Sequence, residues 1–293
     1  MIKYILLKVG VLNFQRFKNN VLKNRGNIRM KSFLLFCIGS VSLFQIRNSI
    51  KQNKKTKPKR QTHTNEKQID GIVFGETGVN FAYQLGIAKY IQTQFNTNNY
   101  KMGGISGGCQ CAFLLANDIN VELFFNDVIV HVFQEKNKNF KEVFELTDKQ
   151  LRQFFKLYGS IEKIRNKLFI CITRLFPYIH NHTAYNFKTY SDLYGSLKAS
   201  QYIPLVFGNW CTKYHDTKCI DGFVSCLGYK PTNEKWITLK LYHFSYYYYC
   251  TGVICLFKLF DVNYHKRLYK EGYTDAQKRH DYFLKLGFVE KKQ

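Results

Sequence analysis

Ser106 lies in a short stretch of the sequence that consists mostly of glycine. Ser106 follows Gly104 and Ile105 and precedes Gly107 and Gly108, in the pattern Gly-x-Ser-x-Gly, directly before an apolar stretch. That pattern is typical of the sharp turn from a strand into a helix that exposes a nucleophilic hydroxyl. Small neighbours keep the turn tight and let a substrate carbonyl approach the main chain. The alternative interpretation is a glycine-rich turn whose serine only caps the next helix.

The elements expected around Ser106 bring two loops to one edge of a parallel sheet. Residues 69–74 predict a short buried strand, residues 75–80 a glycine-bearing turn, and residues 81–95 a helix with apolar side chains at a 3.6-residue period. A short strand then leads to Ser106 and a second helix. Because the carboxyl ends of parallel strands meet at one edge, we expect backbone N–H groups of the first turn beside Ser106, where an oxyanion hole is required.

Five segments resemble the patatin-like phospholipase family, in the order that the family has them and across about residues 70–285. The resemblance implies an α/β fold of three layers, with a mainly parallel central sheet flanked by helices. It also implies a lipid acyl hydrolase, a phospholipase or an acylglycerol lipase, with a lipid ester as its substrate and no metal or other cofactor. The segments are FGETGVNFAYQLGIAKY (74–90), GISGG (104–108), SDLYGSLKASQYIP (191–204), CIDGFVS (219–225) and LYKEGYTDAQ (268–277).

The resemblance implies a Ser–Asp dyad, with Ser106 as the nucleophile and Asp221 as the base. The acyl group would transfer to the Ser106 hydroxyl oxygen and then to water. Asp221 follows a strand-like stretch and precedes Gly222, so we expect its carboxylate at a strand end facing Ser106. Taken alone, the Asp-Gly pair favours a plain turn over a catalytic role.

Backbone donors for the oxyanion are expected in the first turn and directly after the nucleophile. The family's turn reads Gly-Gly-Gly-x-Arg/Lys-Gly, whereas this chain has Glu76 to Phe81 in its place, with Asn80 at the cationic position. The Glu76 carboxylate would oppose a developing oxyanion unless it pairs with a lysine or points to solvent. The expected donors are Gly75, Thr77, Gly78 and Gly107, and the expected supports of the tight turns are Gly104, Gly108 and Gly222.

Positive charge is concentrated in an N-terminal extension. The formal net charge is +24, and residues 1–69 hold 16 of the 44 Lys and Arg but one acidic residue. The apolar segment at 32–44 would reach only about 20 Å as a helix, less than a bilayer core of about 30 Å. We therefore expect either an interfacial anchor with the polybasic run at 51–60, or a disordered leader. Charge alone also permits a nucleic-acid-binding arm. Residues 70–293 form the expected hydrolase domain.

Nine cysteines lie scattered along the chain without a Cys-x-x-Cys pair. Their spacing favours buried free thiols in a reducing compartment over a zinc site. With the basic extension, this predicts a protein associated with a membrane or lipid-droplet surface. No nucleic-acid partner is expected, and the sequence does not determine the oligomeric state.

Two further segments carry weaker signals. Residues 120–180 predict amphipathic helices that cover the site, as an acyl-chain channel or as plain core, and residues 239–260 predict a strand followed by an aromatic loop.

Two other functions compete with the dyad. One is an α/β-hydrolase triad that uses His243, His265 or His280, although the chain has room for only one strand–helix unit before the strand that leads to Ser106. The other is a protein of patatin-like fold that binds lipid or a partner without turning over esters.

Overall fold

A computed structural model describes residues 69–134, 140–204, 207, 209–226, 229–254 and 258–292. The predicted extension at 1–69 lies outside the described residues, apart from Ile69. In the described part of the chain, no helix combines the length and the apolar character needed to cross a bilayer.

Four parallel strands form the part of the sheet that carries the site. These are β1 (Gly71–Phe74), β2 (Lys101–Ile105), β3 (Leu168–Arg174) and β7 (Trp236–Leu239), in the spatial order β3-β2-β1-β7. β1 and β2 are buried along most of their length, as is typical of central strands covered on both faces.

Antiparallel strands flank β3 on its free side and at its carboxyl end. β4 (His180–Ala184) returns along one part of β3, and β6 (Thr217–Ile220) pairs with the end of β3. β5 (Thr212–Tyr214) pairs with β6 and forms the outer edge. The described sheet is therefore mixed, with a parallel centre and an antiparallel flank.

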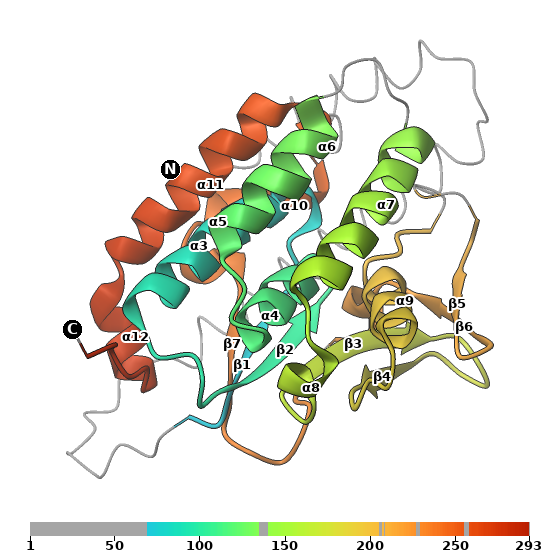
Figure 1. Ribbon diagram of the computed structural model, residues 1–293, viewed down its shortest axis with the longest axis horizontal. Coiled ribbons are helices and arrows are strands. Elements are labelled where there is room, and N and C mark those ends of the chain that lie inside the picture. The colour runs from blue at the N-terminus through green and yellow to red at the C-terminus, as the bar shows by residue number, and fades with distance from the viewer. Residues whose placement is uncertain are drawn as a thin grey trace, which may run out of the picture. The chain divides into compact units, whose positions relative to one another are not determined.

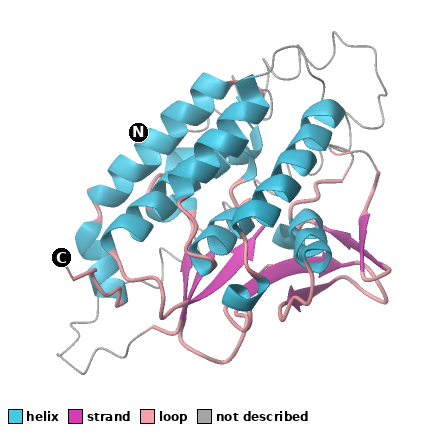
Figure 2. Ribbon diagram, viewed as in Figure 1, coloured by secondary structure: helices cyan, strands magenta, loops and turns pink. Residues whose placement is uncertain are grey.

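The helices gather over one face of the sheet (Figures 1 and 2). α3 and α4 connect the first strands, α7 and α9 lie beyond α4, and α10 to α12 follow β7. Their bounds are α3 (Phe81–Gln94), α4 (Gly108–Ala116), α5 (Val121–Phe124), the π-helix η2 (Phe125–Val130), α6 (His131–Gln134), α7 (Phe140–Tyr158), α8 (Ile161–Ile164), α9 (Tyr190–Ser200), α10 (Tyr246–Ile254), α11 (Val262–Gln277) and α12 (His280–Leu286), with the 3-10 helices η1 (Gly78–Asn80), η3 (Gly222–Ser225) and η4 (Leu241–His243).

Side-chain alternation divides the core into two clusters. Ile72 and Phe74 of β1 face the helices, whereas Val73 points to the opposite face. There it packs in a smaller cluster with Tyr229 and Trp236. The expected flanking helices are thus present on the first face. On the second face, the described chain supplies η3 and the segment that leads into β7.

Two predictions of local structure were wrong. Residues 168–174 were expected within an amphipathic helix, but they form β3, which is buried over six of its seven positions. A short run of apolar residues does not distinguish a buried strand from a helix. The aromatic stretch after β7 was expected to be a loop, but it contains η4 and α10, and α10 packs against η1. The closing helix was expected at 268–277 and is part of α11.

Candidate active site

Ser106 occupies a strained turn between β2 and α4. Its backbone φ is +53°, in the left-handed region that residues with a side chain rarely adopt. This turn is possible because glycines in β2 and α4 let the two backbones pack closely together. A Cβ at Gly104 would lie 2.5 Å from the Cα of Cys109, and one at Gly108 would lie 2.4 Å from the carbonyl oxygen of Phe74. Both glycines therefore fit the supporting role predicted for them.

Asp221 contacts Ser106, as the sequence predicted. The Ser106 hydroxyl donates to Oδ2 of Asp221 at 2.7 Å, and both residues are buried, with 7% and 6% of their surfaces exposed. The other carboxylate oxygen accepts from the backbone N–H of Phe223 at 2.8 Å. Asp221 also donates its own N–H to Tyr202, and its carbonyl accepts from the Thr173 hydroxyl. The carboxylate is therefore fixed on both oxygens and through its backbone.

Strand register explains why two residues 115 positions apart meet. β4 pairs with one side of β3, while β2 and β6 share the other side, where Ile105 pairs with Cys171 and Ile220 pairs with Thr173. Ser106 and Asp221 each come one residue later in the chain, so both reach the level of Ile172. The residue after Asp221 packs directly against β3 and has no room for a side chain. A Cβ at Gly222 would lie 2.3 Å from the carbonyl oxygen of Cys171.

Burial raises the pKa of Asp221 from 3.8 to about 7. Hydrogen bonds from Phe223 and Ser106 lower the pKa in part, and the negative charge of Glu76 raises it. A carboxylate with this pKa binds a proton far more readily than an exposed one, which is what a general base near neutral pH requires.

Ser200 holds the turn at Ser106, a role that sequence reasoning missed. Its hydroxyl accepts the backbone N–H of Ser106 at 3.0 Å and donates to the carbonyl of Cys171 at 2.6 Å. The thiol of Cys109 also donates to it at 3.0 Å. The sequence signal that could have identified this residue is the Ala199-Ser200 pair in the segment at 191–204. That pair did not indicate what the hydroxyl does.

The first turn lies beside Ser106, and its residues differ in how well they fit the donor role. Gly78, with φ +56°, lines the same cavity as Ser106 and Gly107. Thr77 abuts the nucleophile turn, because a Cβ at Gly107 would lie 2.2 Å from the Thr77 hydroxyl oxygen. Gly75 does not fit the role, because its N–H already donates to the carbonyl of Leu239 at 2.9 Å as an extension of the sheet.

Glu76 pairs with a lysine. Its Oε1 lies 3.2 Å from Nζ of Lys240, and the glutamate side chain is 8% exposed. Burial alone would lower the pKa of Lys240, but the adjacent carboxylate outweighs that effect and the pKa is raised. The positive charge of Lys240 thus offsets the negative charge of Glu76. This is the lysine pairing under which we expect the Glu76 carboxylate not to oppose a developing oxyanion.

Asn80 ties the first turn to the C-terminal helices instead of supplying a cation. Its Nδ2 donates to the carbonyl of Tyr248 at 2.6 Å and to the hydroxyl of Thr251 at 3.2 Å, both on α10. Its Oδ1 accepts from the hydroxyl of Tyr264 on α11 at 2.7 Å. The residue is fully buried, so its role is to fix η1 against α10 and α11.

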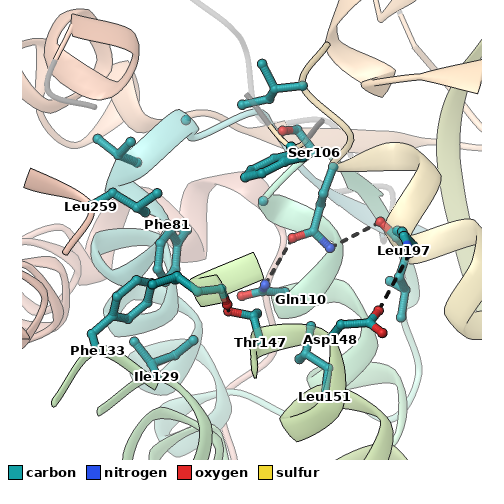
Figure 3. Close-up of a pocket in the computed structure, with 18 of the residues that line it drawn as sticks. Phe81, Ser106, Gln110, Ile129, Phe133, Thr147, Asp148, Leu151, Leu197 and Leu259 are labelled. Carbon is teal, nitrogen blue, oxygen red and sulfur yellow. Dashed lines mark hydrogen bonds and ion pairs between the residues drawn. The ribbon is translucent and has the colours of Figure 1, made fainter. Parts of the chain in front are cut away.

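A cavity of about 130 Å³ opens at Ser106 (Figure 3). Figure 3 shows Phe81, Ile129 and Phe133 together on one side of the cavity. On another side, Gln110 donates to Gln201 at 3.0 Å. The remaining lining residues are Gly78, Val79, Gly107, Val143, Thr147, Asp148, Leu151, Tyr194, Leu197, Lys198, Ile203, Phe207 and Leu259.

Several of these lining residues belong to the segment at 120–180, which was predicted to cover the site. Within that segment, η2, α6 and α7 supply the cavity wall.

The three histidines of the alternative triad have other partners. A ring nitrogen of His243 accepts from the backbone of Lys240, and His265 is hydrogen-bonded to the carbonyl of Leu259. His280 bonds to Tyr90 and Glu290. Among the described residues, the side chain paired with Ser106 is the carboxylate of Asp221.

The seven cysteines in the described part of the chain are all free thiols, and five of them are buried. The same part of the chain contains no cluster of three or more His, Cys, Asp or Glu side chains arranged to hold a metal ion.

Comparisons with known proteins add little to this geometry. No protein-family model and no curated protein matches the chain. Among solved structures, it is similar to the crystal structure of VipD from Legionella pneumophila, with a TM-score of 0.38 and 10% sequence identity over 64% of this chain. The match spans 55% of VipD. A similarity at this level supports no inference about activity, which therefore has to come from the site itself.

Proposed function

We propose that this protein is an acyl hydrolase of patatin-like type that cleaves carboxylic esters of lipids through the Ser106–Asp221 dyad. The observation that carries the proposal is the 2.7 Å hydrogen bond from the Ser106 hydroxyl to the Asp221 carboxylate, on a strained turn that borders a largely apolar cavity. A nucleophile held by its base in this way is the arrangement that covalent acyl transfer requires.

In the first half of the reaction, Asp221 takes the proton of the Ser106 hydroxyl while the oxygen attacks the ester carbonyl. The developing oxyanion faces the backbone N–H groups of Gly78 and Gly107, with Thr77 as a further donor. Each such donor contributes about 3 kcal/mol in serine hydrolases. Collapse of the intermediate releases the alcohol, which takes its proton from Asp221, and leaves an ester on Ser106.

In the second half, Asp221 takes a proton from water, and the resulting hydroxide attacks the acyl-enzyme. The carboxylic acid leaves, and the proton returns from Asp221 to the Ser106 oxygen. The pKa of about 7 suits both halves, because the same group must accept and return a proton.

The cavity supports a lipid substrate. Phe81, Ile129 and Phe133 offer an apolar wall to an acyl chain, while Gln110 and Gln201 offer polar groups to the part of the substrate next to the ester. Binding sites commonly combine such walls with a few polar groups that fix orientation.

A fluorophosphonate probe tests the proposal, since it reacts covalently with an activated serine hydroxyl. We expect the wild-type protein to be labelled and Ser106→Ala to remain unlabelled. Ser196→Ala serves as the matched control, because the Ser196 hydroxyl is also buried but bonds only locally, to the carbonyl of Leu193. Labelling that persists in Ser106→Ala would refute the assignment of the nucleophile.

A second candidate function is binding of lipid or of a partner without turnover. It is favoured by the first turn, where the hydrogen bonds of Asn80 go to α10 and α11 and the N–H of Gly75 is bound within the sheet. A folded wild-type protein that the probe does not label would favour this candidate.

A further inference from the structure

We propose that the turn between β3 and β4 inserts into the surface of a lipid membrane that carries anionic headgroups. The segment concerned is 175–179, which we call the β3–β4 tip. The inference concerns binding to a surface and does not depend on the proposed hydrolysis, although it would bring the cavity at Ser106 close to its substrate.

The β3–β4 tip exposes large apolar side chains. Phe176, Tyr178 and Ile179 are 60%, 69% and 62% exposed. Three such residues within four positions of one turn are unusual for a surface that faces only water. Aromatic residues of this kind are favoured at the boundary between headgroups and acyl chains.

The tip projects on the same edge of the sheet as the site. Ser106 and Asp221 both reach the level of Ile172 on β3, as the register shows. β3 continues in the same direction, and Phe176 comes four residues later. At about 3.3 Å per residue in a strand, the tip begins about 10 Å beyond the level of the dyad. A flat surface that contacts the tip would therefore face this edge.

Cations lie beside the tip on β5 and β6. Lys213 and Lys218 are exposed and stand directly opposite each other in the antiparallel register. Like charges at opposed positions repel and destabilise a strand pair, so an anionic partner would relieve an existing cost. Asp216, in the turn between these strands, is the one acidic residue from 212 to 220, against these two lysines.

The cations and the apolar tip form one continuous surface. The ammonium of Lys218 lies 5.5 Å from the ring centre of Phe176, and the backbone N–H of Leu175 donates to the carbonyl of Lys218. Arg174, at the base of the tip, is hydrogen-bonded to His182 on β4. Apolar side chains at the tip with basic side chains behind them match the layers of an anionic bilayer.

The test uses the full-length chain carrying Ser106→Ala, so that its outcome is independent of hydrolysis. A tryptophan is introduced as Phe176→Trp, and its fluorescence is measured with phosphatidylcholine vesicles that contain phosphatidylserine and acyl-brominated lipids. We expect quenching above that of the parent protein. Leu157→Trp is the matched control, because Leu157 is 74% exposed at the end of α7, near the opposite edge of the sheet where β3 begins. This control is expected to show no added quenching.

Two variants separate the apolar and the ionic parts. Exchange of Phe176, Tyr178 and Ile179 for serine should weaken vesicle binding by at least about tenfold. Lys213→Glu with Lys218→Glu should weaken binding to vesicles with phosphatidylserine, but not to vesicles of phosphatidylcholine alone. Urea unfolding of each variant checks that it is folded.

Three outcomes would overturn the proposal. The first is a lack of vesicle binding by the full chain. The second is binding without added quenching at position 176, which would place the contact elsewhere in the chain, such as in the basic extension. The third is a dimer in size-exclusion chromatography that the serine exchanges abolish, which would make the tip a contact between two copies of this chain.

Discussion

The replacement Asp221→Asn tests both the chemistry and the electrostatics of the dyad. An asparagine has nearly the same shape, and its single amide oxygen can still accept from the N–H of Phe223, so the turn is expected to persist. The amide cannot take the proton of Ser106. Loss of a general base lowers rates by about 10²–10⁴-fold, and we expect kcat/KM for a p-nitrophenyl ester to fall within that range.

If the proposed mechanism holds, the esterase activity of the wild-type protein should be lost in acid. Burial raises the pKa of Asp221 to about 7, so the carboxyl group is protonated below that pH and cannot act as a base. We therefore expect kcat/KM to rise with pH and to reach half of its maximum near pH 7.

Ionisation of Asp221 should also change the free energy of unfolding. As the pH rises, the activity is expected to increase but the stability is expected to decrease. Because the pKa is higher in the folded protein than the ordinary 3.8, the folded state binds the proton more tightly than the unfolded state. The stabilisation is fully present below about pH 4 and is lost as the pH rises through about 7. The full difference is about 4 kcal/mol, of which about 2.5 kcal/mol falls between about pH 5 and about pH 8.

Urea unfolding of the wild type and of Asp221→Asn under reducing conditions measures this pH-dependent part of the free energy of unfolding. The free energy of unfolding of Asp221→Asn minus that of the wild type should rise by about 2.5 kcal/mol from about pH 5 to about pH 8, since all other titrating groups are shared. Asp281→Asn is the control, because that side chain is exposed on α12 and faces water in both states. A difference that stays constant within about 0.5 kcal/mol would refute the reasoning that the carboxyl group is buried and desolvated.

Three further replacements probe the surroundings of the dyad. Ser200→Ala leaves the buried N–H of Ser106 without its acceptor, so urea unfolding should show a loss of about 1–3 kcal/mol, and fluorophosphonate labelling should slow. Gly108→Ala places a methyl group 2.4 Å from a carbonyl oxygen of β1, so the free energy of unfolding should fall by about 1–3 kcal/mol or more, which the same urea titration measures. Glu76→Gln removes a negative charge that raises the pKa of Asp221, so the rise of kcat/KM should move to lower pH; a shift to higher pH would contradict the assigned sign.

The sequence by itself determined the local features of the site. Three glycines within five positions favour a tight turn at Ser106, and the apolar runs before and after it predict buried elements. These signals act within a few residues, so they can be read without the fold. They placed β1, α3, β2 and α4, whereas Asp221 was assigned through the resemblance to a family, because an Asp-Gly pair by itself is typical of a plain turn.

Only the tertiary structure decided which groups meet and how they are charged. The register of β3 against its two neighbours brings Ser106 and Asp221 to one level, and local sequence carries no information on register between distant strands. The pKa of Asp221, the Glu76–Lys240 pair and the hydroxyl of Ser200 depend on burial by segments far apart in the chain. The folding of 168–174 as β3 and of the aromatic stretch as α10 was likewise decided by packing, because tertiary contacts override the weak preferences of short segments.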